Sequence, residues 1–409
     1  MQYKSYKIRL EPSNVQSTLL LQHCGVARHA YNVGLAYCND LFKKGEKIPS
    51  AITLHKWLVS DIKKECPWYY KSSKCAPQAA LIDLEKAFKN FHRVQKKSGY
   101  KLKDKKGFLK GLPRFKKKGK KDSFYLDGVI RIENNLIKLP RIGWIKLSEN
   151  IEGFKINNCV ISRKANNWFV SFKIEFLPIK TEKKSDVVGV DLGIKTLATL
   201  SNGEVFKNIN PYKNAKKKLR KRQKELSRRF VKEAKNQSNN YKKSLLKFTK
   251  THTQINNVRL DNLHKITTYL AKNFETVVIE DLKVKSMVKN HNLASAILDG
   301  GFYEFKRQLL YKKEWYGGNV ILANTYFPSS KLCSCCGSKK EILKLSEREY
   351  TCTECSSVMD RDFNASKNLE NLAVSSTVIA FGDKSSDVGK TTFQLVDELG
   401  IKHQMFTFV

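Results

Sequence analysis

The spacing of apolar residues predicts a strand and then a helical bundle in the N-terminal part of the chain. The segment KSYKIRL (4–10) alternates polar and apolar residues, which is typical of a short strand. Residues 13–99 then have apolar residues at helical spacing, most clearly in 26–42 and 75–94. These helices are expected to share a core of Leu, Ala and Phe.

The next part of the pattern predicts β-structure. Residues 123–178 contain β-branched and aromatic runs, with turn residues at Asn134–Asn135 and again at Asn166 and Asn167. Runs of this kind on either side of a short polar turn favour hairpins. We expect a small β-barrel or sandwich that the N-terminal strand completes.

The C-terminal half alternates between strands and helices. Residues 185–206 predict two strands and a further turn, and a long charged helical stretch follows from Pro211 to Asn273. A buried strand is expected in NFETVVIEDLKV (273–284), and another helix in DFNASKNLENLAV (362–374). The last 35 or so residues have no apolar period and are expected to form a flexible tail.

The net charge of the chain predicts the kind of partner that it binds. The chain has 77 Lys and Arg against 38 Asp and Glu, for a formal net charge of +39. Such an excess favours a polyanion, most simply nucleic acid, over a small neutral metabolite. A membrane surface is disfavoured, because the sequence has no run of about 18 apolar residues and no signal peptide. Residues 101–121 and 213–229 concentrate basic side chains, although 213–229 could be only a solvated helix face.

The cysteines predict a metal site. Five of the ten cysteines lie between positions 333 and 355. Four of them form two Cys-x2-Cys pairs, Cys333 with Cys336 and Cys352 with Cys355, and fifteen residues separate the pairs. This spacing is typical of a structural zinc site. Cys335 could replace Cys336 as a ligand, but we prefer Cys336 because it keeps the two-residue spacing and precedes Gly337.

Three acids predict a second, catalytic site. Asp191 ends an apolar strand, Glu280 lies inside another, and Asp362 begins a helix. A carboxylate in a buried strand is costly without a partner, and oxygen ligands suit Mg²⁺. Strand alternation points Asp281 away from Glu280. The alternative role of Asp362 is a helix N-cap. The order of strands, helices and acids fits an RNase H-like nuclease with two Mg²⁺ ions.

Four sequence blocks in this order resemble the TnpB family, the transposon-encoded RNA-guided DNA endonucleases of the OrfB/RuvC type. The type V CRISPR effectors are relatives of this family. The resemblance covers about 1–372. The blocks are GVDLGIKTLATLSNGE (189–204), VVIEDLKVKSM (277–287), the cysteine ribbon and DRDFNASKNL (360–369), with further similarity at 27–35 and 111–124.

The resemblance implies an α/β multidomain fold with a RuvC-type, RNase H-like nuclease domain. It implies Asp191, Glu280 and Asp362 as catalytic acids that hold two Mg²⁺ ions, and one structural Zn²⁺ on the four paired cysteines. The expected parts are a wedge β-barrel (1–10 and 123–180), a helical recognition lobe (11–122), the nuclease domain (186–325 and 360–372), a zinc ribbon (326–359) and a flexible tail (373–409).

The resemblance also implies partners. A guide RNA derived from the transposon end pairs with one strand of double-stranded target DNA, and the protein reads a short flanking motif. We expect a monomer with one RNA, in the cytoplasm and associated with the nucleoid. The alternatives are a non-cleaving RNA-guided regulator and an RNase H-type DNA strand transferase. Candidate nucleic-acid contacts are Lys74, Gln78, Arg114, Lys116, Lys117, Lys118, Lys217, Arg220 and Arg222, of which Lys74 and Gln78 could equally be ordinary helix residues.

Overall fold

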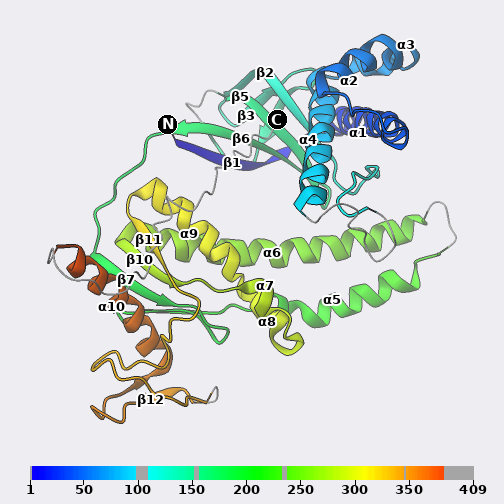
Figure 1. Cartoon of the computed structure of the whole chain (residues 1–409). Helices are drawn as coiled ribbons and strands as arrows, with labels where there is room; N and C mark the ends of the chain where they lie inside the picture. The colour runs from blue at the N-terminus through cyan, green and yellow to red at the C-terminus, as the bar shows by residue number, and fades with distance from the viewer. Residues whose placement is uncertain (1, 98–108, 152–155, 233–236, 345–346, 382–409) are drawn as a thin grey trace. The chain divides into compact units, whose positions relative to one another are not determined.

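The computed structural model describes residues 2–97, 109–151, 156–232, 237–344 and 347–381. The chain forms two compact units, which meet in the sequence between Phe176 and Leu177. Figure 1 shows the elements of both units along the chain. Within the described ranges, no helix has the length and apolar character needed to cross a membrane.

The first unit contains a closed six-stranded barrel in the order β1-β4-β3-β2-β5-β6. This confirms the expected barrel, closed by the N-terminal strand, which pairs with β6 from Gln2 to Leu10. The first hairpin turns at Asn134 as expected, but the second turns at Ala165 and Asn166, so Asn167 already belongs to β6. The strands are β1 (Gln2–Glu11), β2 (Ser123–Glu133), β3 (Leu136–Leu139), β4 (Gly143–Leu147), β5 (Ile156–Lys164) and β6 (Asn167–Phe176).

Two long helices, α1 and α4, pack against the barrel and share its core. Ser13 and Gln16 form a capping box at the start of α1. The expected helical bundle is confirmed, with short helical turns between its two long members. The helical elements are α1 (Asn14–Lys43), α2 (Ala51–Trp57), a π-helical turn (Leu58–Ile62), α3 (Lys63–Glu65), a 3₁₀ turn (Pro67–Lys71) and α4 (Cys75–Lys97).

The second unit is built on a five-stranded sheet in the order β11-β10-β7-β8-β9. Strand β10 runs parallel to both β7 and β11, whereas β8 and β9 are antiparallel to their neighbours. Residues 185–206 form three strands rather than the two expected. The strands are β7 (Ser185–Asp191), β8 (Thr196–Leu200), β9 (Val205–Lys207), β10 (Phe274–Glu280) and β11 (Asn319–Ala323).

Helices cover both faces of this sheet. Figure 1 shows α6 and α9 on one side of the strands and α10 on the other. The side chains of Val188 and Ile279 pack with α6 and α9, whereas Val278 packs with Leu369 of α10. The expected long helical stretch is two helices. Further along the chain, Gly301 has a left-handed backbone and separates two more helices. The helices are α5 (Pro211–Arg228), α6 (Asn239–Asn273), α7 (Val284–Met287), α8 (His291–Gly300), α9 (Phe302–Tyr316) and α10 (Arg361–Phe381).

A small ribbon connects β11 to α10. Its two strands, β12 (Glu349–Thr351) and β13 (Val358–Asp360), pair in antiparallel fashion. Helix α10 extends to Phe381, so the first residues of the expected tail are helical. The remainder of the expected tail, 382–409, lies outside the described residues.

Candidate active site

The sheet register brings Asp191 and Glu280 together. Val190 of β7 is paired in parallel with Ile279 of β10, so the next residues, Asp191 and Glu280, end neighbouring strands side by side. Neighbouring strands lie about 4.8 Å apart, and paired positions point to the same face of a sheet. Both carboxylates therefore lie at the carboxyl edge of the sheet on one face.

That face is the one covered by α10. Two residues before Asp191, Gly189 lies so close to the helix that an added Cβ would be 1.9 Å from the Ser366 carbonyl oxygen. Asp191 shares the face of Gly189 because side chains alternate along a strand. Asp362 lies one turn before Ser366 on α10. The close contact at Gly189 thus places the first turn of α10, with Asp362, beside the two strand ends.

The capping role that Asp362 could have taken belongs to Asp360. One carboxylate oxygen of Asp360 accepts hydrogen bonds from the backbone N–H groups of Asp362 (2.9 Å) and Phe363 (3.0 Å). The alternative role of Asp362 as the N-cap is therefore wrong. The carboxylate of Asp362 instead accepts hydrogen bonds from the Arg361 guanidinium at 3.1 and 3.3 Å.

The three acids affect one another electrostatically. Burial, followed by the negative charges of Glu280 and Asp362, raises the pKa of Asp191 to about 8, and Arg361 offsets only part of this. A site that accumulates carboxylates in this way fits a divalent cation, because the cation relieves their repulsion. Hard carboxylate oxygens are the donors that Mg²⁺ prefers. The donor set therefore fits the expected Mg²⁺.

Asp281 points away from this cluster, as strand alternation predicted. Its carboxylate forms an ion pair with the Lys306 ammonium of α9 at 2.6 Å. Two cavities adjoin the acids on the surface of this unit. One of about 620 Å³ is lined by Glu280 and Lys283, and one of about 420 Å³ is lined by Asp362 and Lys195.

Sequence reasoning missed one residue of the cluster. The hydroxyl of Ser329, in the loop after β11, donates a hydrogen bond of 2.5 Å to Oε1 of Glu280. Ser329 lies 49 positions from Glu280 in the sequence. It belongs to none of the motifs, and serine is too common for its position alone to have indicated this contact.

The structure brings together the four cysteines of the two pairs. Their Sγ atoms all lie within 4.8 Å of one another, which fits a single tetrahedral ion. Cys335 is exposed and lies outside this group, as its spacing suggested. The four cysteines are Cys333, Cys336, Cys352 and Cys355.

The two cysteine pairs lie on matching knuckles. Gly337 and Ser356, each directly after the second cysteine of a pair, both have a left-handed backbone. In each knuckle the N–H of the first cysteine donates to the carbonyl five residues later, at 2.9 Å. The backbone N–H of Cys355 and the Ser338 hydroxyl lower the pKa of Cys352 to about 6. A thiolate is the form that binds zinc, so the donor set fits the expected ion.

The predicted nucleic-acid contacts of the first unit lie at the surface. Lys74 and Gln78 are exposed at the start of α4, and Arg114, Lys117 and Lys118 are exposed after it. Lys116 is already engaged within the protein. Its ammonium lies 3.7 Å from the carboxylate of Asp83 and 4.0 Å from the centre of the Tyr31 ring. Residues 101–108 of the basic segment lie outside the described residues.

The basic helix α5 has one exposed face. Lys217 and Arg220 are exposed, whereas Leu219 and Leu226 are buried. Arg222 is only partly exposed, and its guanidinium donates to the carbonyl of Lys247 on α6 at 2.7 Å. Arg222 therefore joins α5 to α6, and the other two remain the better candidates for phosphate contacts.

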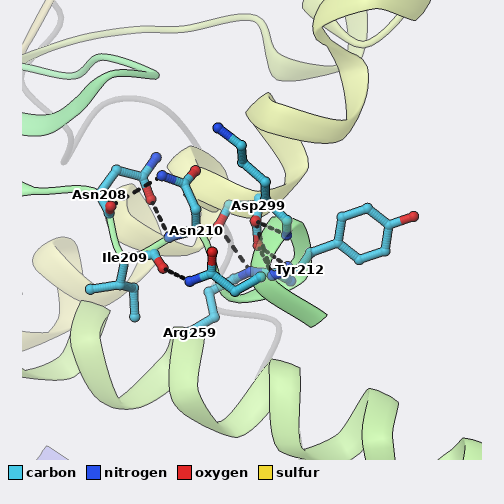
Figure 2. A network of polar contacts seen from close by, with 8 residues as sticks. Asn208, Ile209, Asn210, Tyr212, Arg259 and Asp299 are labelled. Atoms are coloured by element: carbon cyan, nitrogen blue, oxygen red, sulfur yellow. Dashed lines mark hydrogen bonds and ion pairs between the residues drawn. The ribbon is translucent and has the colours of Figure 1, made fainter. Parts of the chain in front are cut away.

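A buried acid fixes the start of α5. Asn210, the N-cap position of this helix, has a left-handed backbone and no capping side-chain bond. Asp299 of α8 replaces the cap, accepting from the N–H groups of Tyr212 (3.0 Å) and Lys213 (3.2 Å). The guanidinium of Arg259, on α6, also donates to the Asp299 carboxylate, at 2.8 Å. Figure 2 shows Arg259 and Asp299 side by side. This single carboxylate ties three helices together.

Comparison with known proteins gives the family. The chain is 33% identical over 401 residues to "Putative RNA-guided DNA endonuclease InsQ" of Escherichia coli (strain K12), an alignment covering 93% of this chain and 94% of that protein. The chain belongs to the TnpB family. A relative from Streptomyces pristinaespiralis, described as "Putative RNA-guided DNA endonuclease", is 33% identical over 392 residues, an alignment covering 93% of this chain and 91% of that protein.

Family models match three parts of this TnpB-family chain. The OrfB_IS605 family, described as "Probable transposase", matches residues 171–291, and "Cas12f1-like, TNB domain" matches 302–369. Residues 1–47 match a "Helix-turn-helix domain", but they fold here as β1 and the single long helix α1.

A solved structure shares the fold of this TnpB-family chain. It is a cryo-EM structure of a Cas12f1-sgRNA-target DNA complex, with a TM-score of 0.51 at 15% sequence identity. The match covers 90% of this chain and 99% of the Cas12f1 chain. It agrees with the expected α/β multidomain fold.

Proposed function

We propose that this chain is an RNA-guided, Mg²⁺-dependent endonuclease that cuts double-stranded DNA with a RuvC-type site. The observation that carries the proposal is the placement of Asp191, Glu280 and Asp362 at one sheet edge by β7, β10 and the first turn of α10. The names of the relatives support the RNA-guided part, and the intact acid trio disfavours a non-cleaving regulator.

The three acids would hold two Mg²⁺ ions. When bound, Mg²⁺ supplies positive charge that stabilises the attacking and leaving oxygens of a phosphodiester. The protein contributes fixed carboxylates, of which Glu280 is restrained by the Ser329 hydroxyl. Lys283 and Lys195 line the adjoining cavities, and each offers a positive charge for the phosphates of a DNA strand.

The basic surfaces would hold the nucleic acid. Lys217 and Arg220 on α5 face outward, and Asp299 fixes the helix that carries them. We assign to these two side chains, and to Lys117 and Lys118, contacts with the phosphates of the guide RNA or the RNA–DNA duplex. The guide would come from the transposon end, one RNA per protein. Zn²⁺ on the four cysteines would have a structural role, because protein ligands fill all four positions.

The test uses the protein with the RNA that copurifies with it. That RNA is sequenced, and a plasmid with the matching target is incubated with the complex and Mg²⁺. We expect a discrete non-coding RNA and a linearised plasmid. Asp191→Ala should reduce the cleavage rate by about 1,000-fold or more and leave RNA and target binding intact.

Asp186→Asn is the matched control. This acid lies on the same strand as Asp191 but is exposed near the amino end of β7, so cleavage should stay near the wild-type rate. Random RNA fragments would contradict guidance by RNA. Normal cutting by Asp191→Ala would contradict the metal site, and joined DNA ends formed without RNA would favour a strand transferase.

A further inference from the structure

The loop Ser329–Ser334 lies between the catalytic acids and the cysteine cluster. At its first residue, the buried hydroxyl of Ser329 donates to Oε1 of Glu280 at 2.5 Å, and only 2% of Ser329 is exposed. Near its end, Cys333 is one of the four clustered cysteines. One short segment therefore contacts both sites.

Two buried amides of α10 fix this loop. The Asn368 side-chain N–H groups donate to the carbonyl oxygens of Ser329 (2.8 Å) and Leu332 (2.7 Å). The Asn364 side chain donates to the Leu332 carbonyl at 2.6 Å and accepts from the Ser334 N–H at 2.9 Å. Both amides are almost fully buried, with Asn364 at 0% and Asn368 at 5% exposure.

These contacts determine where Cys333 and Ser329 can lie. Leu332 and Ser334, the neighbours of Cys333, are both bonded to Asn364, so a movement of the knuckle must disturb the amide contacts. Leu332 also shares Asn368 with Ser329. Buried polar groups without partners are costly, so the amides and the loop are expected to shift together rather than separately.

The hydrogen bond from Ser329 orients Glu280. A donor fixed on one carboxylate oxygen limits rotation of the group, and so determines the direction of the other oxygen. Groups that hold metal ligands in this way change metal affinity or activity by about 10- to 100-fold when they are removed. The position of Ser329 is itself set by the loop that carries Cys333.

We propose that Ser329 is a positioning residue for Glu280, and that Asn364 and Asn368 couple its hydroxyl to the cysteine cluster. Filling of the cluster by Zn²⁺ holds Leu332–Ser334 in place and thereby keeps the catalytic carboxylate aligned. This inference rests on the proposed function. It adds a route by which a structural ion controls the catalytic site.

The first test measures the Mg²⁺ requirement of Ser329→Ala. We expect the Mg²⁺ concentration for half-maximal cleavage to rise by about 10-fold or more, with weaker Mn²⁺ binding by calorimetry and an unchanged zinc content. Ser329→Thr, which retains a hydroxyl, should restore most of the affinity. Ser334→Ala is the matched control, because the hydroxyl of Ser334 contacts the Met359 sulfur rather than the network.

The second test combines Ser329→Ala with Asn368→Ala. Because the two side chains act through one loop, the double variant should need no more Mg²⁺ than the more affected single variant. If the fold-increase in Mg²⁺ requirement of the double variant equals the product of the two single increases, the coupling is wrong. Unchanged Mn²⁺ binding by Ser329→Ala would overturn the positioning role.

These outcomes are distinct from a failure of the proposed function. If either occurs while Asp191→Ala still abolishes cleavage, this inference is wrong and the proposed function stands.

Discussion

Replacing Gly189 by alanine should slow DNA cleavage without altering any of the three proposed catalytic acids. The added Cβ would lie 1.9 Å from the Ser366 carbonyl oxygen and 2.6 Å from the Glu370 nitrogen, both in the backbone of α10. Real Cβ contacts essentially never fall below 3.0 Å, so the helix must retreat from β7 by about 1.1 Å, the difference between 1.9 and 3.0 Å. Asp362, one turn away, must move with it.

A displacement of about 1 Å at a catalytic group can reduce a rate by about 100-fold. Overpacking of this kind also lowers the free energy of unfolding by about 1–3 kcal/mol. We therefore expect Gly189→Ala to cleave about 100-fold more slowly at a temperature where circular dichroism shows it folded, and to have a lower melting temperature. The rate is measured at saturating guide RNA, with target binding followed separately.

Gly318→Ala is a control for loss of stability without a displacement of Asp362. Its Cβ would lie 2.2 Å from the Glu275 carbonyl oxygen, a similar clash at the amino end of β10, away from the acids. It should lower the melting temperature, but its folded fraction should cleave at the normal rate. Gly25→Ala meets only the Arg28 side chain, at 3.9 Å, and should be neutral or slightly stabilising. Near-normal cleavage by Gly189→Ala would refute the argument that α10 positions Asp362 through this contact.

Three further predictions concern the cluster and the basic helix. Purified protein should contain one equivalent of zinc by mass spectrometry, which Cys352→Ser loses and Cys335→Ser keeps. Asp299→Ala should lower the free energy of local opening of α5 by about 2–4 kcal/mol, because Arg259 and two backbone N–H groups lose their partner. Hydrogen exchange measures this free energy, and unchanged protection of the α5 amides would argue against the cap. Replacing Lys217 and Arg220 together by glutamine should weaken the salt dependence of RNA binding. The slope of log K against log salt concentration should become about 1.5 less negative, whereas a slope equal to that of the wild type would exclude both residues as phosphate contacts.

The sequence predicted those features that depend on local pattern or on spacing. Asp191, Glu280 and Asp362 were predicted because strand and helix boundaries could be located, and Cys336 was preferred to Cys335 on spacing alone. The same reasoning separated Asp281 from Glu280. Each of these inferences needed only alternation, a helix start or a fixed interval.

Two kinds of contact could not be predicted in this way. One is local: whether Asp360 or Asp362 caps α10 depends on the backbone geometry where the ribbon enters the helix. The other kind joins distant segments. Ser329 meets Glu280, and Asp299 caps α5, only because the chain returns through β11 and α8. The sequence pattern holds no information on which of many similar serines or acids will make such a contact.

The position of α10 after the ribbon has a consequence for protein synthesis. A nascent chain contains Asp191 and Glu280 long before Asp362, and the ribbon must leave the ribosome before the helix that carries the third acid. Because α10 packs on the sheet face that holds Gly189 and Val278, these contacts cannot form until then. A truncated product that ends before α10 would expose apolar residues of this sheet face and would lack the third acid of the proposed site.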